Sequence, residues 1–265
     1  MKIQPPNQNS AYRQFVGPDL ACAPRGSTIY AVGDIHGRID LLDALLGKIA
    51  DDARNDKSPR RVLIFLGDYV DRGAGIFQVV ERLSTLSETG DFEIFRQFDL
   101  HFLKGNHESS LIEFLDTGDH TDSWMDMDNG GGETLKSYGV DASGLLAGGN
   151  LTRMRRDLQA AMPDRHLEFL RNLALHHEEG DYFFVHAGVR PGVALDVQDP
   201  FDMLWIRQEF LSCRADFGKI IVHGHSPNSE PAIKNNRIGI DTAAYYSDCL
   251  TALVLQGTRR RFLQT

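Results

Sequence analysis

The chain has 265 residues, of which 42% are hydrophobic and 25% are charged, and its formal net charge at pH 7 is −9. This composition suits one large globular α/β domain, with or without a small cap, and the acidic balance argues against nucleic acid as a partner. Three widely spaced cysteines without a CxxC pair argue against a disulfide framework and favour a cytoplasmic location, and no apolar run approaches the roughly 20 residues that a membrane span needs.

The first 27 residues contain scattered prolines and polar residues, and they lack the apolar core of a signal peptide. We therefore expect an N-terminal arm at 1–27, followed by one domain at 28–265. Strands and amphipathic helices alternate in the first part of this domain: strands at about 28–33 and 61–66 and one ending near 102, with helices at 39–50 and from 76 to about 90. This β-α-β-α-β order predicts a parallel core.

Glycine becomes frequent from residue 116 to about 165, a stretch too long for a simple connection. We expect a small helical cap there. A helix is predicted at 200–211. The last four strands are predicted at 219–223, 231–240, 248–255 and 259–263, as a meander with a turn at 234–237.

Five strand-like runs each lead into aspartate, asparagine or histidine beside glycine. The blocks that follow these runs are 33–37, 67–73, 105–108, 186–188 and 223–226. Ligands of open α/β sheets bind outside the carboxyl ends of the strands. The five blocks are therefore predicted to assemble one site.

These blocks supply six side chains with oxygen or imidazole donors: Asp34, His36, Asp68, Asn106, His186 and His225. A donor set without cysteine suits Mn²⁺, Fe or Zn²⁺. Six ligands are too many for one ion with an open position, whereas two ions can share them if one carboxylate bridges. Asp68 is the expected bridge because it follows the central strand. Such a pair of ions clamps the attacking and departing oxygens of an in-line displacement.

The blocks Gly-Asp-Ile-His-Gly at 33–37, Gly-Asp-Tyr-Val-Asp-Arg-Gly at 67–73 and Gly-Asn-His-Glu at 105–108 resemble the signatures of the phosphoprotein phosphatase family. That family belongs to the calcineurin-like metallophosphoesterases, and the resemblance, closest to its bacterial branch, spans roughly 28–255. His-Ala-Gly at 186–188 and Gly-His-Ser at 224–226 match its two later histidine blocks. The resemblance implies an α/β fold, a β-sandwich of two mixed sheets flanked by helices, with a small helical cap.

The resemblance also implies a role for each site residue. Asp34 and His36 would hold the first metal ion, Asp68 would bridge, and Asn106, His186 and His225 would hold the second. The two divalent ions are expected to be Mn²⁺, with Fe or Zn²⁺ as alternatives.

The same resemblance makes His107 the general acid and Asp71 the residue that orients its ring. It makes Arg72 a phosphate-binding residue, and it implies a second such arginine, for which Arg207 is the best candidate. Asn106 also belongs to the expected phosphate site.

The favoured function is that of a metal-dependent protein serine/threonine phosphatase. Phosphorylated proteins or peptides would be its substrates, and a hydroxide bridging the two ions would attack phosphorus directly. The alternative is a dinucleoside-polyphosphate hydrolase that resembles the symmetrical diadenosine tetraphosphatases. Asp71 and Glu108 favour the phosphatase, because the diadenosine enzymes tend to carry another residue at the first position and Asp at the second. A binding module without activity is disfavoured because every ligand and the acid are present.

Three further histidines, His101, His176 and His177, lie outside these blocks. Core packing or surface exposure is expected for them rather than metal ligation.

Overall fold

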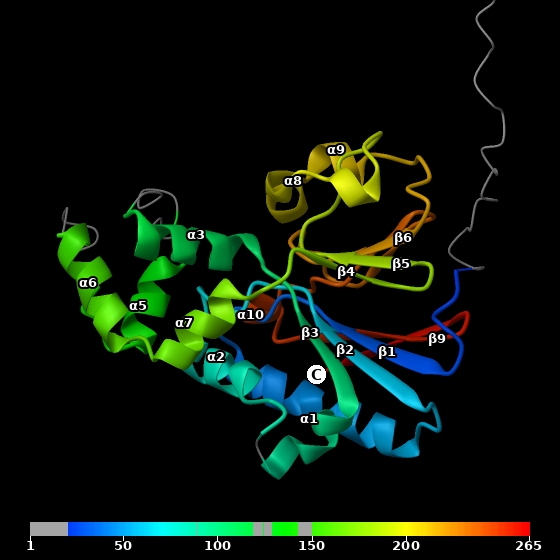
Figure 1. The fold of residues 1–265 in the computed structure, drawn as a ribbon, viewed down its shortest axis with the longest axis horizontal. Helices are drawn as coiled ribbons and strands as arrows, with labels where there is room; N and C mark the ends of the chain where they lie inside the picture. The colour runs from blue at the N-terminus through cyan, green and yellow to red at the C-terminus, as the bar shows by residue number, and fades with distance from the viewer. Residues whose placement is uncertain (1–20, 89, 119–123, 125–128, 143–149) are drawn as a thin grey trace, which may run out of the picture.

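The computed structural model describes residues 21–88, 90–118, 124, 129–142 and 150–265. Most of the predicted arm and part of the predicted cap lie outside the described residues. Two five-stranded mixed sheets face each other, with helices on their outer faces (Figure 1). The predicted fold class is therefore confirmed. In this part of the chain, no helix combines the length and the apolar character that crossing a bilayer requires.

The first sheet has the strand order β10-β9-β1-β2-β3. Its strands are β1 (Ser27–Val32), β2 (Arg60–Phe65), β3 (Phe98–Phe102), β9 (Thr251–Gln256) and β10 (Arg259–Gln264). β1, β2 and β3 are parallel, as predicted, and β9 and β10 add antiparallel strands beside β1. The connections between the parallel strands are α1 (Ile39–Asn55), α2 (Ile76–Ser84) and the 3₁₀ segment η1 (Gly90–Gln97).

The second sheet has the order β4-β5-β6-β8-β7. Its strands are β4 (His176–Glu179), β5 (Tyr182–Val185), β6 (Ile220–His223), β7 (Ala232–Ile233) and β8 (Arg237–Gly239). The predicted meander is wrong, because β6 pairs with β8 in parallel and β9 and β10 belong to the first sheet. Local alternation indicates a strand but does not identify its partner. The predicted turn is present, since Lys234 N–H donates to the Arg237 carbonyl across the β7–β8 hairpin.

Alternate residues of each central strand face different cores. Ile29 and Ala31 of β1 face the second sheet, where they join Phe184 of β5 in one cluster. Tyr30 and Val32 point the other way, towards the helices on the outer face. Burial on both faces explains the continuous apolar runs of the sequence. It also fixes the ends of the strands, where the polar blocks begin.

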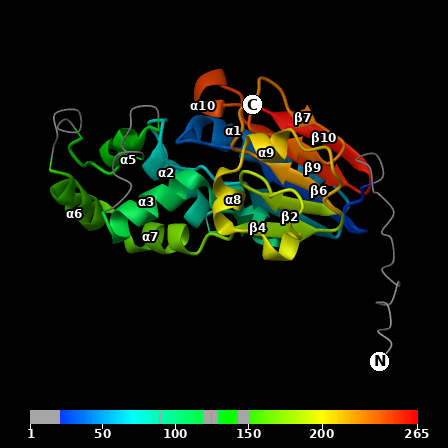
Figure 2. The ribbon, with the colours of Figure 1, turned by 90° about the horizontal axis from the view of Figure 1, so that it is seen from above.

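Helices gather at one end of the sandwich and over its second sheet (Figures 1 and 2). The helices at the end are α3 (Asn106–Asp116), α5 (Gly131–Ser137), α6 (Leu151–Ala161) and α7 (Asp164–Arg171). Those near the second sheet are η3 (Leu195–Val197), α8 (Pro200–Trp205) and α9 (Gln208–Leu211), and α10 (Ala244–Ser247) precedes β9. The predicted helix at 200–211 is thus two helices, broken where Ile206 is extended at φ −61° and ψ 139°.

Candidate active site

The five predicted blocks meet at one edge of the sandwich. They follow β1, β2 and β3 of the first sheet and β5 and β6 of the second, and within each sheet these strands are parallel. Their carboxyl ends therefore open in the same direction. The structure brings together side chains from all five blocks, including the six predicted metal ligands, as the contacts described below establish.

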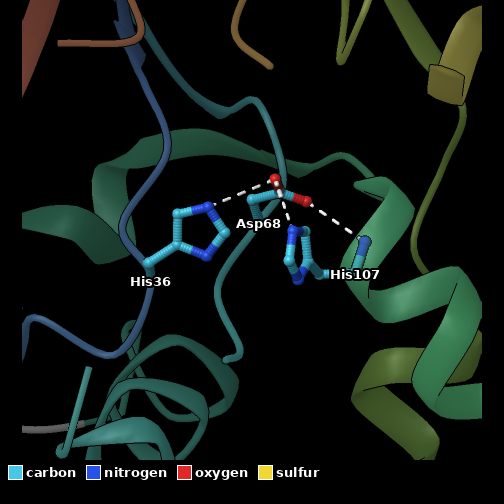
Figure 3. A group of neighbouring side chains, drawn as sticks. All are labelled: His36, Asp68 and His107. Carbon is cyan, nitrogen blue, oxygen red and sulfur yellow. Dashed lines mark hydrogen bonds and ion pairs between the residues drawn. The ribbon is translucent and has the colours of Figure 1, made fainter. Parts of the chain in front are cut away.

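Asp68 lies between His36 and His107 (Figure 3). Its Oδ2 is 3.4 Å from His36 Nε2 and 3.8 Å from His107 Nε2. Its Oδ1 is 3.3 Å from His186 Nε2. Asp68 also belongs to two separate triads of potential ligands, one with His36 and His107 and one with His186 and His225. A carboxylate whose two oxygens face different imidazoles is placed as a bridging ligand would be.

Backbone carbonyls fix the orientation of two of the rings. His36 Nδ1 lies 2.9 Å from the Val70 carbonyl oxygen, and His186 Nδ1 lies 2.9 Å from that of Leu66. A carbonyl only accepts, so Nδ1 carries the proton and Nε2 presents a lone pair to the centre. His186 Nε2 is also 2.9 Å from Asn106 Oδ1, another acceptor. A cation between these two acceptors would stabilise them.

Two buried ligand atoms have no hydrogen-bond partner among the described residues: Asp34 Oδ1 and His225 Nε2. The other Asp34 oxygen accepts from the His225 backbone N–H at 2.9 Å, so the two residues lie side by side. Burial raises the pKa of Asp34, and the charges of Asp241 and Asp68 raise it further. Buried carboxylates that raise one another's pKa, as those of Asp34, Asp68 and Asp241 do, are stabilised by positive charge. The residues present therefore fit a site for divalent cations.

The loops that carry these residues adopt unusual backbone conformations. His36, Asp68, Asp71, Arg72 and His225 all have positive φ, between 45° and 68°. Such conformations cost about 1–3 kcal/mol each in non-glycine residues and concentrate at functional sites. Gly224 allows the close approach of two loops, because a Cβ there would lie 2.0 Å from Asp34 Oδ1.

His107 contacts Asp71, the residue to which the resemblance assigns the orientation of its ring. Its Nδ1 lies 2.7 Å from Asp71 Oδ2. Burial lowers the pKa of His107, but the charges of Asp68 and Asp71 outweigh burial and raise it to about 8. Asp71 is fully buried and accepts two more hydrogen bonds, from Trp124 Nε1 and Thr134 Oγ1. Those two residues come from the predicted cap, and no sequence signal linked them to Asp71.

Glu108 binds the backbone of the loops that form the site. Its carboxylate accepts from the backbone N–H groups of Gly105, Asp68, Tyr69 and Val70, at 2.7–3.1 Å. Its side chain is fully buried. Glu108 therefore joins the second and third blocks and holds the loop that carries Asp68.

The two predicted phosphate-binding arginines lie near the centre. The Arg72 guanidinium is 4.5 Å from the centre of the Tyr245 ring, and its Nε is buried without a partner among the described residues. Arg207 is exposed, and its charge contributes to the lowered pKa values of His186 and His225, after burial as the main cause. Both guanidinium groups are thus available to an anion.

Sequence reasoning missed Asp241 and Trp205 at this edge, and it left Tyr245 and Tyr246 open between lining the substrate mouth and packing. Asp241 follows β8, whose parallel pairing with β6 brings its carboxyl end to the same edge. Burial raises its pKa to about 6, and Asp68 adds to the rise. The aromatic residues form a rim. Trp205 lies edge-on to His225 with centroids 6.3 Å apart, and Tyr245 lies edge-on to His36 at 5.5 Å.

The rim contains all four exposed aromatic residues among the described ones. Phe201 and Trp205 belong to α8 and stack at 6.3 Å, and Tyr245 and Tyr246 belong to α10. Phe201 is 67% exposed and Tyr246 is 84% exposed. Large exposed aromatic side chains around a polar centre commonly mark a binding surface.

Comparison with known proteins adds family information. The sequence model of the calcineurin-like phosphoesterases matches residues 27–249. The asymmetrical bis(5'-nucleosyl)-tetraphosphatase PrpE of Oceanobacillus iheyensis is 23% identical over 241 residues, which cover 83% of this chain and 86% of that protein. Serine/threonine-protein phosphatase 2 of Escherichia coli is 33% identical over 91 residues, 34% of each chain. A crystal structure of a proposed diadenosine tetraphosphatase superimposes with a TM-score of 0.59 at 19% identity, covering 92% of this chain and 98% of that one.

Proposed function

Because the chain belongs to the calcineurin-like phosphoesterase family and is a hydrolase of the metallophosphoesterase type, we propose that its substrates are dinucleoside polyphosphates of the diadenosine tetraphosphate class. The observation that carries this proposal is the aromatic rim beside the predicted metal ligands. A relative that aligns over most of both chains is named as a bis(5'-nucleosyl)-tetraphosphatase, which also supports it.

The rim suits nucleobases. Stacking of one base on an aromatic side chain contributes about 1–3 kcal/mol. Trp205 stands beside His225 and Tyr245 stands beside His36, so planar groups could stack on either helix while a phosphate chain lies between the two histidines. A dinucleoside polyphosphate has this composition, with two bases joined by a chain of anionic phosphates.

The two residues that favoured a protein phosphatase do not discriminate between substrates. Asp71 and Glu108 are both fully buried. Asp71 acts on His107, and Glu108 binds backbone N–H groups. Neither side chain is exposed to a bound substrate, so their identity does not select the group attached to the phosphate.

The residues of the site would have separate roles in hydrolysis. Arg72 and Arg207 would bind the phosphate chain through paired N–H donors, which suit phosphate geometry. His107 would donate its Nε2 proton to the departing oxygen, while Asp71 holds the Nδ1 proton. When bound by Asp34, His36, Asp68, Asn106, His186 and His225, two divalent ions, for which we propose Mn²⁺, would neutralise phosphate charge and activate water.

Hydrolysis forms one bond from the water oxygen to phosphorus and breaks one P–O–P bond. The oxygen of the departing nucleotide takes the electron pair and the proton. Cleavage of diadenosine tetraphosphate yields two ADP if it is symmetrical, and ATP with AMP if it is asymmetrical.

A protein serine/threonine phosphatase is the second candidate. The observation that favours it is an acid at the site, His107, whose Nε2 lies 3.8 Å from Asp68 Oδ2, because a serine or threonine alkoxide is a poor leaving group that needs a proton. A phosphorylated nucleotide leaves more readily and depends less on that proton.

Steady-state kinetics with Mn²⁺ tests the two candidates. The substrates would be diadenosine tetraphosphate, a phosphoserine peptide and p-nitrophenyl phosphate, and chromatography would identify the nucleotide products. We expect kcat/KM for the dinucleotide to exceed that for the peptide by at least about tenfold, a difference of about 1.4 kcal/mol. Preferential turnover of the peptide would replace the first proposal with the second.

A further inference from the structure

A second group of potential metal ligands lies outside the loop site, at the edge where the two sheets meet. His101 is on β3, the edge strand of the first sheet, and His177 and Glu179 are on β4, the edge strand of the second. One nitrogen of each histidine and one oxygen of the glutamate lie within 4.8 Å of one another. We propose that these three side chains bind a divalent transition-metal ion of the Zn²⁺ type that links the two sheets.

The two imidazoles are already arranged as neighbours. Their ring centroids are 3.6 Å apart, and the ring planes differ by 24°. His101 Nε2 is buried and has no hydrogen-bond partner among the described residues. An unpaired buried polar atom costs about 1–3 kcal/mol, which coordination to a cation would remove.

The glutamate is held in place from the other side. Arg60 donates through its two terminal nitrogens to the two Glu179 oxygens, at 2.8 and 2.7 Å, and through Nε to Asp99 at 2.7 Å. His177 Nε2 lies 3.1 Å from Glu179 Oε1. A cation bound by His177 Nε2 and Glu179 would replace this contact. Arg60 would continue to orient the carboxylate, as hydrogen-bonded neighbours of metal ligands commonly do.

The charge balance permits a cation. Asp99 and Glu179 contribute two negative charges beside the two imidazoles, and Arg60 contributes one positive charge. The donor set of two imidazoles and one carboxylate is one that Zn²⁺ adopts, with a water as the fourth ligand.

The position gives the ion a structural role. The sheets meet here through short backbone contacts: Ala174 N–H donates to the Phe102 carbonyl at 3.1 Å, and Lys104 N–H donates to the Ala174 carbonyl at 2.7 Å. His101 and His177 lie beside this junction on their respective strands. An ion bound by both strands would stabilise the folded state, and the stabilisation would grow with the logarithm of its affinity.

Metal stoichiometry tests the proposal on the full chain. The chelator-treated protein is dialysed against Zn²⁺, and bound zinc is counted by mass spectrometry. We expect the wild type to bind one ion more than His177→Phe, because phenylalanine keeps the ring stack and lacks the nitrogen. His101→Phe should lose the same ion. His176→Phe is the matched control, since His176 is the neighbouring histidine on β4 and stacks on Phe183 rather than on His101.

Two further measurements make the outcome decisive. The hydrolysis of p-nitrophenyl phosphate with Mn²⁺ should stay within about twofold of wild type in both variants, which shows that they fold. Zn²⁺ should raise the unfolding midpoint more in the wild type and in His176→Phe than in the two variants. Equal zinc content in the wild type and both variants would overturn the site, whatever the substrate of the loop site proves to be.

Discussion

His107 Nδ1 lies 2.7 Å from Asp71 Oδ2, and neither side chain is more than 5% exposed. Asp71 in turn accepts from Trp124 Nε1 at 2.9 Å and from Thr134 Oγ1. The imidazole is therefore fixed by a carboxylate that is itself fixed by Trp124 and by Thr134 of α5. His107 Nε2 points towards Asp68, so this chain of contacts ends at the predicted metal centre (Figure 3).

Asp71→Asn should change the pH dependence of hydrolysis. The pKa of His107 is raised to about 8, and Asp71 contributes to that rise. An acid must keep its proton, so the rate falls as pH rises through this pKa. Loss of the carboxylate should move the alkaline limb of the pH–rate profile, where the rate falls, to lower pH by about 1 unit or more. The measurement is kcat against pH for an alkyl phosphate. Asp40→Asn, at an exposed aspartate on α1, should leave the limb in place.

His107→Asn should separate substrates by their leaving groups. Without the acid, hydrolysis of an alkyl phosphate should slow by about 10²–10⁴-fold. Hydrolysis of p-nitrophenyl phosphate should slow by less than about tenfold, because its leaving group needs little protonation. Equal losses on both substrates would contradict the acid role. Metal analysis of the variant should show an unchanged ion content.

Much of the site could be predicted because its signals are local. The polar blocks stand where buried strands end, and parallel pairing of β1, β2 and β3 brings those ends to one edge. The oxygen and imidazole donors could therefore be grouped from sequence order alone. The two mixed sheets, in contrast, were expected only from the family resemblance, because hydrophobic periodicity does not reveal which strands pair.

What the sequence did not reveal depends on contacts between distant residues. Trp124 and Thr134 reach Asp71 across 53 and 63 positions, and His101 reaches His177 across two sheets. Asp241 joins the site only because β8 pairs in parallel with β6. Hydrophobic periodicity predicts burial and element type, whereas these contacts are set by how elements pack.

Glu108→Gln should destabilise the protein. The Glu108 carboxylate accepts from four buried backbone N–H groups, and an amide would direct its own N–H groups at some of them. Unsatisfied buried donors cost about 1–3 kcal/mol each, so we expect the free energy of unfolding to fall by about 3 kcal/mol or more. Urea titration measures this change. Glu93→Gln should have an effect below about 0.5 kcal/mol, because that side chain is 69% exposed.

Trp205→Ala should weaken binding of the dinucleotide selectively. Loss of one stacking partner is worth about 1–3 kcal/mol, so KM for diadenosine tetraphosphate should rise by about 5–150-fold. KM for p-nitrophenyl phosphate should change by less than about twofold, and Trp205→Phe should restore most of the dinucleotide affinity. Ile233→Ala, at an apolar side chain of β7 that is 47% exposed, is the control for loss of surface area. An equal rise in KM for both substrates would place Trp205 outside any base-binding surface.

Asp68→Asn tests whether one carboxylate serves two ions. Asp68 Oδ2 faces His36 and Oδ1 faces His186, so the substitution should weaken both metal positions together. His225→Gln removes a ligand of only one triad and should affect one position. Protein dialysed against Mn²⁺ should therefore lose two ions per chain in Asp68→Asn and one in His225→Gln, relative to wild type. Hydrolysis by Asp68→Asn should fall by at least about 10³-fold, because removing both ions removes charge stabilisation worth several kcal/mol. Loss of a single ion in Asp68→Asn would show that Asp68 does not bridge the two ions.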